Sequence, residues 1–146
     1  MIKNEKIDAM LETAEVQTSA ISQLRHNLAH WSKCLGGTND SEEEVLIVDS
    51  GKKVYLFSDS AILLAVVGSE GYGHDLTFYP LKNVDYIKLK LEGFVKNFSG
   101  EEVPIGDVRA DFRIAGTDFT INLKNKYGQH LMRILKTKLI PAMEKT

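Results

Sequence analysis

The sequence predicts one α+β domain, with a long amphipathic N-terminal helix, about seven antiparallel strands and a C-terminal helix. Three observations lead to this prediction. Apolar residues recur on a heptad before Gly36, short β-rich runs separated by turn residues fill 45–123, and a helical apolar stripe follows at 127–139. The period of the apolar pattern changes from helix to strand and back, and that change indicates the fold class.

The N-terminal segment has the pattern of a long helix. It runs from Lys3 to Leu35 without proline or glycine, and Gly36 and Gly37 end it. Eight of nine heptad positions are apolar, namely Ile7, Met10, Ala14, Ile21, Leu24, Leu28, Trp31 and Leu35. Such a helix spans roughly 45 Å, which exceeds the width of a small barrel. We therefore expect this seam to pack on a second copy or on another protein, with packing on the chain's own strands as the alternative.

The middle of the chain reads as strands and turns. The expected strands are 45–49, 54–58, 61–68, 76–81, 84–91, 108–115 and 119–123. In the sixth strand Ala110, Phe112 and Ile114 alternate with charged residues. This alternation predicts a sheet with one buried side and one solvent-facing side.

Residues 92–107 interrupt this series. They contain Gly100, Pro104 and Gly106, which disfavour regular strands. We expect irregular chain here, with at most a brief pairing at Phe94 and Val95.

A second helix is expected at 127–139. Its apolar face consists of Leu131, Ile134, Leu135 and Leu139. Pro141 follows and should end it, because proline lacks the N–H that a helix interior requires.

Charge and composition exclude several classes of protein. The net charge is −2, but 124–146 hold six basic side chains against one acidic, a local balance of +5. A nucleic-acid-binding protein is more often basic overall, so we expect no nucleic-acid partner. The chain has one cysteine, Cys34, and no apolar run long enough for a signal peptide or a membrane span. We expect a cytoplasmic protein.

No motif of catalysis or cofactor binding is recognisable, so the sequence predicts no enzyme and no cofactor. His26, His30 and Cys34 share one helix stripe, but the first and last lie about 12 Å apart, too far for one metal ion. A solvated helix face is the simpler interpretation, and no metal site is expected. The glycine-rich loop Gly68–Gly73 joins two strands rather than a strand and a helix, which argues against a phosphate cradle.

Three stretches resemble the bacterial pleckstrin-homology-like (PH-like) and GRAM-like domains: Lys53–Leu64, Phe78–Ile87, and Phe112–Leu123 followed by Tyr127–Leu139. The resemblance covers about 45–140. It implies an antiparallel β-barrel of about seven strands capped by the C-terminal helix, at 45–143, with the helix at 1–37 as an addition. Lipid-binding members hold phosphates with basic residues of the first hairpin. Here the resemblance points to Lys52 and Lys53, although the Arg-x-Arg partner of that site is absent.

These features favour a non-catalytic protein-interaction module that forms a homodimer, or binds another protein, through the N-terminal helix. Peripheral binding to an anionic membrane through Lys52 and Lys53 is the first alternative. A ligand-binding or enzymatic protein with a cone-shaped sheet is the second.

Overall fold

The computed structural model describes residues 26–28, 30, 31, 33, 44–48, 52–67 and 74–144. The chain divides into two compact units, Met1–Pro80 and Leu81–Thr146. The boundary between them falls after Pro80, whereas the sequence suggested a helix at 1–37 and a barrel at 45–143.

The first unit contains a four-stranded antiparallel sheet in the order β1-β2-β3-β4. Its strands are β1 (Glu44–Val48), β2 (Lys53–Phe57), β3 (Ala61–Val67) and β4 (His74–Pro80). The β2–β3 turn is fixed by Ser58, whose Oγ accepts a hydrogen bond from the Ala61 N–H at 3.0 Å. The Ser58 N–H in turn donates to the Ala61 carbonyl. Local bonds of this kind set the register of the hairpin.

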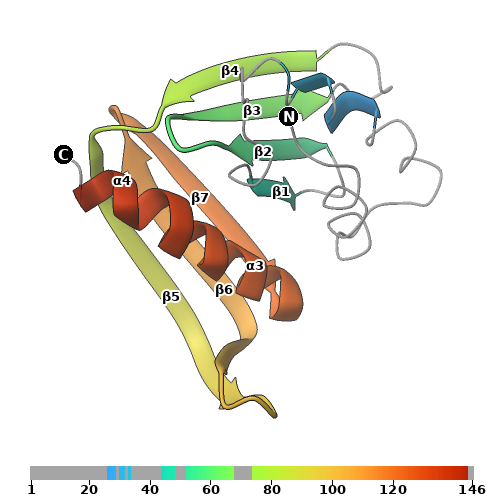
Figure 1. The fold of residues 1–146 in the computed structure, drawn as a ribbon, viewed down its shortest axis with the longest axis vertical. Helices are drawn as coiled ribbons and strands as arrows, with labels where there is room; N and C mark the ends of the chain where they lie inside the picture. Colours follow the sequence, from blue (N-terminus) through green and yellow to red (C-terminus); the bar gives the residue numbers. More distant parts are fainter. Residues whose placement is uncertain are drawn as a thin grey trace. The chain divides into compact units, whose positions relative to one another are not determined.

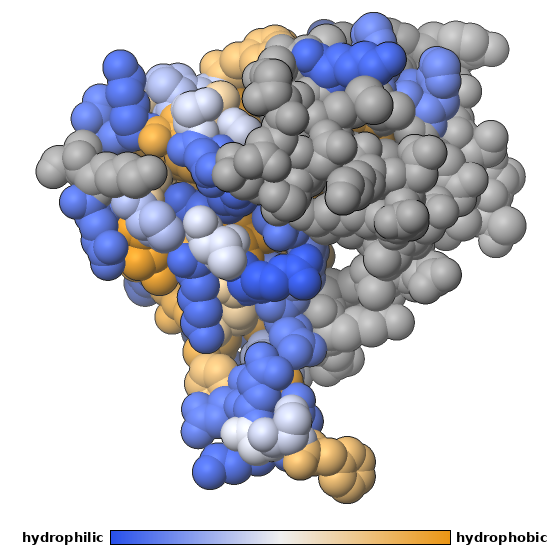
Figure 2. All heavy atoms as spheres, viewed as in Figure 1, coloured by the Kyte–Doolittle hydropathy of each residue, from blue (hydrophilic) through white to orange (hydrophobic). Residues whose placement is uncertain are grey.

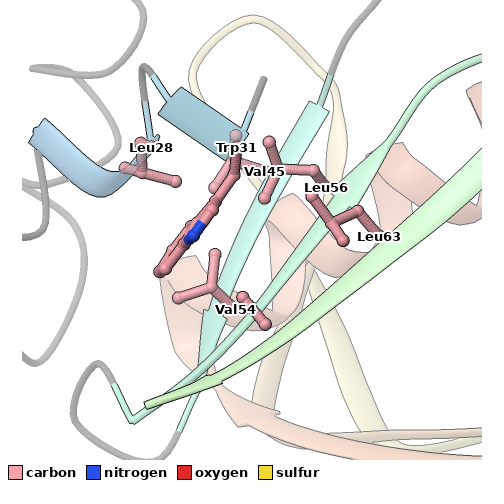
Figure 3. Packing of buried hydrophobic residues seen from close by; sticks show 7 residues of the cluster. Leu28, Trp31, Val45, Val54, Leu56 and Leu63 are labelled. Atoms are coloured by element: carbon pink, nitrogen blue, oxygen red, sulfur yellow. The ribbon is translucent and has the colours of Figure 1, made fainter. Parts of the chain in front are cut away.

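Helical residues cover one face of this sheet. Leu28 and Trp31 are buried there in a cluster with Val45, Val54, Leu56, Leu63 and Ala65 (Figure 3). On the opposite face of the sheet Leu46, Tyr55, Phe57 and Ile62 are also buried. Burial on both faces explains why these strands read as nearly continuous apolar runs.

The second unit contains a three-stranded antiparallel sheet in the order β5-β6-β7 (Figure 1). Its strands are β5 (Val84–Lys96), β6 (Glu102–Ile114) and β7 (Thr117–Lys124). The β6–β7 turn consists of Ala115 and Gly116, both with positive φ (49° and 85°). Positive φ at both central residues is typical of a type I′ turn, whose twist matches that of the two flanking strands.

A C-terminal helical segment packs on β6 and β7. It comprises α3 (Asn125–Ile134), a π-helical turn η2 (Leu135–Leu139) and α4 (Ile140–Glu144). Leu131, Ile134, Leu135 and Leu139 are buried, which confirms the predicted apolar face. The predicted end at Pro141 is wrong, because Pro141 lies inside α4. The π turn just before it changes the hydrogen-bond pattern, with the Ile140 N–H bonding the Leu135 carbonyl.

The expected closed PH-like barrel is wrong. In the described part of the chain the seven strands form two separate sheets, and no strand of one pairs with a strand of the other. Pro80 and the left-handed Asn83 (φ 56°) interrupt the chain between β4 and β5. Asn83 instead accepts the Ala115 N–H through its carbonyl, and β5 pairs with β6.

The long N-terminal helix is likewise not seen. Before β1, the described helical residues are 26–28, 30, 31 and 33. The other seam positions, Ile7, Met10, Ala14, Ile21, Leu24 and Leu35, lie outside the described residues.

Candidate interaction surface

The candidate functional site of the second unit is the distal part of its longest hairpin, β5–β6. β7 pairs with β6 only from Asp107 to Ile114. Beyond that point β5 and β6 continue as a two-stranded ribbon, with pairs from Gly93↔Ile105 to Lys96↔Glu102. We call residues 92–107 the arm. It extends past the end of β7 and past α3 (Figure 1).

The arm begins at a β-bulge. The register shifts between Leu91↔Val108 and Gly93↔Ile105, so that Glu92 stands opposite both Gly106 and Asp107. Gly106 has φ 73°, and a side chain there would overlap the side chain of Glu92. The positive φ is the reason for glycine here, because other residues adopt it only with strain.

The tip of the arm is a compact turn organised by Asn97. Its Oδ1 accepts hydrogen bonds from the Ser99 N–H (3.0 Å), the Ser99 hydroxyl (2.7 Å) and the Glu101 N–H (3.0 Å). The Asn97 N–H donates to the Glu101 carbonyl, and the Gly100 N–H donates to the Asn97 carbonyl. Gly100 takes the left-handed conformation (φ 81°) that a three-residue hairpin loop needs at this position.

This ordered tip holds Phe98 entirely in solvent, with a relative exposure of 112%. Phe94, Val95 and Ile105 follow along the arm, each between 44% and 46% exposed. Figure 2 shows the apolar side chains at the tip, at the lower end of the view. The other exposed large apolar residues described are Val66, Phe78 and Ile140, on three different elements, and Tyr86 and Leu89, on the inner part of β5. Clustered apolar exposure is typical of a binding surface, whereas scattered residues are ordinary.

The arm is also acidic. Its charged side chains are Glu92, Lys96, Glu101, Glu102 and Asp107, which gives a net charge of −3. The arm therefore presents aromatic and aliphatic groups on an anionic ribbon.

Nearer the base of the sheet, the face away from the helix carries charged and polar side chains that pair with one another, unlike the apolar side chains of the arm. Asp111 accepts the Thr120 hydroxyl at 2.7 Å and pairs with Arg109. These contacts, the Thr120 hydrogen bond first, hold the pKa of Asp111 below its ordinary value. The Tyr86 hydroxyl donates a hydrogen bond to Asp118. The pKa of Tyr86 is raised, mainly by desolvation and secondly by the negative charge of Asp118. Charged groups here satisfy one another, as on an ordinary solvated surface.

The site residues expected from the sequence lie elsewhere. Of the predicted seam, Leu28 and Trp31 are described, and both are 1% exposed or less in the core of their own unit. Lys52 is exposed in the turn before β2, and its carbonyl accepts the Val67 N–H. Lys53 is half-buried in β2 opposite Val48 and Val66. The sequence-based prediction missed the arm. It expected irregular chain at 92–107, because glycine and proline are typical of loops.

The described residues give no separate indication of a metal site or a membrane span. They hold no group of three or more His, Cys, Asp or Glu side chains placed to bind a metal ion. His26 and His30 are exposed, and Cys34 lies outside the described residues. No helix within the described ranges is long and apolar enough to cross a bilayer.

Comparison with known proteins adds no relative. No family model, no curated protein and no solved structure matches the chain. Nothing in these comparisons identifies a PH-like or GRAM-like domain.

Proposed function

We propose that this protein is a non-catalytic interaction module that contacts its protein partner through the arm. One observation supports this above all: a turn with three hydrogen bonds to Asn97 Oδ1 presents a fully exposed Phe98. Burial of apolar surface yields about 25 cal/mol per Å². A turn whose backbone is already ordered loses little backbone conformational entropy on binding.

The chemistry of the arm favours a protein over an anionic membrane. Its net charge of −3 would be repelled by acidic headgroups at the point where Phe98 would have to insert. Lys52 and Lys53 belong to the first unit and are not part of this surface.

The arm also replaces the predicted seam as the contact surface. Leu28 and Trp31 already pack against Val45, Val54 and Leu56 of the same unit, so these two side chains are not available to a partner. Phe94, Val95 and Ile105 are 44–46% exposed instead.

Site-specific photo-crosslinking tests this function. A benzophenone amino acid in place of Phe98, in cells that express the protein, should give covalent adducts of discrete mass with a polypeptide. The same group in place of Lys52 serves as the control for an exposed turn outside the arm. Adducts at position 98 that disappear when Phe94→Ser is added support the proposal. Absence of adducts at position 98, or equal adducts at position 52, contradicts it.

A further inference from the structure

The arm has two backbone edges, and one of them is blocked. On the β6 side, Pro104 has no N–H to offer a further strand. On the β5 side, the described residues include no strand that pairs with the outer edge, because β5 is the first strand in the order β5-β6-β7. An open edge of this length is normally protected by charges, bulges or a partner.

The direction of the backbone groups on this edge follows from the tip. The Asn97 N–H points inward, to the Glu101 carbonyl. Successive residues of a strand alternate, so Lys96, Phe94 and Glu92 direct their N–H and C=O groups outward, to the free edge. The same alternation places the nitrogen of Pro104, opposite Phe94, at the other outer edge, where the ladder needs no donor.

The sequence on this edge is complementary to itself. Residues 92–96 read Glu-Gly-Phe-Val-Lys. When two copies are laid antiparallel about Phe94, Glu92 of each copy stands opposite Lys96 of the other. We propose, on the basis of the proposed function, that the partner is a second copy of this chain. The two copies pair along the free edges of β5, with the two Phe94 residues at the two-fold axis.

The backbone pattern fits this arrangement. Residues 92, 94 and 96 of both copies face each other, so Phe94 meets Phe94 and Glu92 meets Lys96 in hydrogen-bonded pairs. Opposed residues in an antiparallel pair project to the same face. The two phenylalanine rings therefore meet at the centre of the interface, where binding energy is concentrated.

The neighbouring positions are complementary as well. Val95 stands opposite Gly93 of the other copy, so an exposed aliphatic side chain lies against a residue without one. The pairing is isologous, so it closes at two copies and uses the free edge of β5 in both.

A charge-swap experiment tests this proposal with sedimentation velocity and light scattering. The wild-type protein should be a dimer that dissociates on dilution. Glu92→Lys places two lysines opposite each other at both ends of the interface, and Lys96→Glu places two glutamates there. Each variant should dimerise roughly tenfold more weakly, or worse. Lys82→Glu and Glu144→Lys change the net charge equally at exposed positions outside the arm, and they should dimerise like the wild type.

Mixing the two arm variants is the decisive step. Lysine at both positions of one chain then faces glutamate at both positions of the other, so a heterodimer should form at concentrations where each variant alone is monomeric. The double variant Glu92→Lys/Lys96→Glu should also regain dimerisation. Phe94→Ser should remove it, with an unchanged circular dichroism spectrum.

Three outcomes would overturn the proposal: a wild-type monomer up to millimolar concentration, arm variants that dimerise like the wild type, or a mixture that stays monomeric. The function itself is tested separately. Crosslinks from position 98 to a different polypeptide, together with a monomeric wild type, would leave the interaction module standing and remove the second copy as its partner.

Discussion

The two halves of the β5–β6 hairpin both carry apolar side chains, but these side chains have different surroundings. In the inner half Val108, Ala110 and Phe112 are fully buried, and α3 packs on β6. In the arm Phe94, Val95 and Ile105 are nearly half exposed, and Phe98 is completely exposed. The strands are continuous through both halves, and the difference lies in what covers them.

The contrast separates two uses of apolar side chains. The inner half uses them to hold the second unit together, since their burial stabilises the fold. The apolar side chains of the arm bury little surface in the fold. They therefore contribute favourable free energy mainly when a partner covers them. Substitutions in the two halves should therefore affect different measurements.

The largest difference is expected between Phe112 and Phe98. The Phe112 ring stacks on Phe119 with centroids 5.1 Å apart, inside the core. Phe112→Ala should lower the free energy of unfolding by about 3–5 kcal/mol. Phe98→Ala should change it by no more than about 0.5 kcal/mol, because the ring has no contacts to lose. Urea unfolding followed by circular dichroism, at concentrations where the protein is monomeric, measures both. Equal losses would remove the distinction between the halves.

A second change tests how closely the inner half is covered. At Gly128 in α3, an added methyl carbon would lie 2.5 Å from Cγ2 and 2.9 Å from Cβ of Val108. Gly128→Ala should lower the free energy of unfolding by roughly 1–2 kcal/mol, since overpacking outweighs the better helix propensity of alanine. In a Val108→Ala background the same change should be neutral or stabilising. A wild-type background that gains stability from Gly128→Ala would show that the helix is not held this close.

The third change concerns the arm alone. Asn97→Ala removes the acceptor of three hydrogen bonds at the tip and should cost about 1 kcal/mol or less, because these bonds are exposed to solvent. Amide hydrogen exchange should accelerate at Ser99 and Glu101, while Val108 keeps its protection. Asn122→Ala, at an exposed position of β7, is the control and should leave the tip unchanged. Accelerated exchange throughout β6 would mean that the arm and the inner half unfold together.

The smallest effect is on the solvated face of the inner half. Thr120→Val removes the hydroxyl that lowers the pKa of Asp111, so the pKa should rise toward the ordinary value of about 3.9. A lowered pKa in the folded state gives stability above the unfolded-state pKa, and this stability is lost as pH falls through the folded-state pKa. A carboxyl-carbon NMR titration measures the shift, with the exposed Thr77→Val as control. An unchanged Asp111 titration would show that Thr120 is not its main partner.

Sequence reasoning predicted the inner half well. The alternation of Ala110, Phe112 and Ile114 with charged residues, and the stripe from Leu131 to Leu139, correspond to the observed core. These signals are local and periodic, so they survive without knowledge of the tertiary structure. The number of strands and the C-terminal helix followed from the same signals, but the closed barrel did not, because strand pairing between distant segments leaves no local pattern.

The arm could not be predicted for a different reason. Pro104 and Gly106 are normally strand breakers, and they fit here because of their places in the ladder. Pro104 faces an unpaired edge, and Gly106 forms the bulge beside Glu92. In retrospect, Phe94, Val95, Val103 and Ile105 on both sides of Asn97–Glu101 were the signal of a hairpin.

Concentration-dependent hydrogen exchange tests the central claim most directly, namely that a second copy covers the free edge of β5. As the protein concentration rises from micromolar to millimolar, the amides of Glu92, Phe94 and Lys96 should become protected. The amide of Val95, which points inward to β6, should exchange at a constant rate. Exchange at Glu92, Phe94 and Lys96 that is independent of concentration would contradict the account.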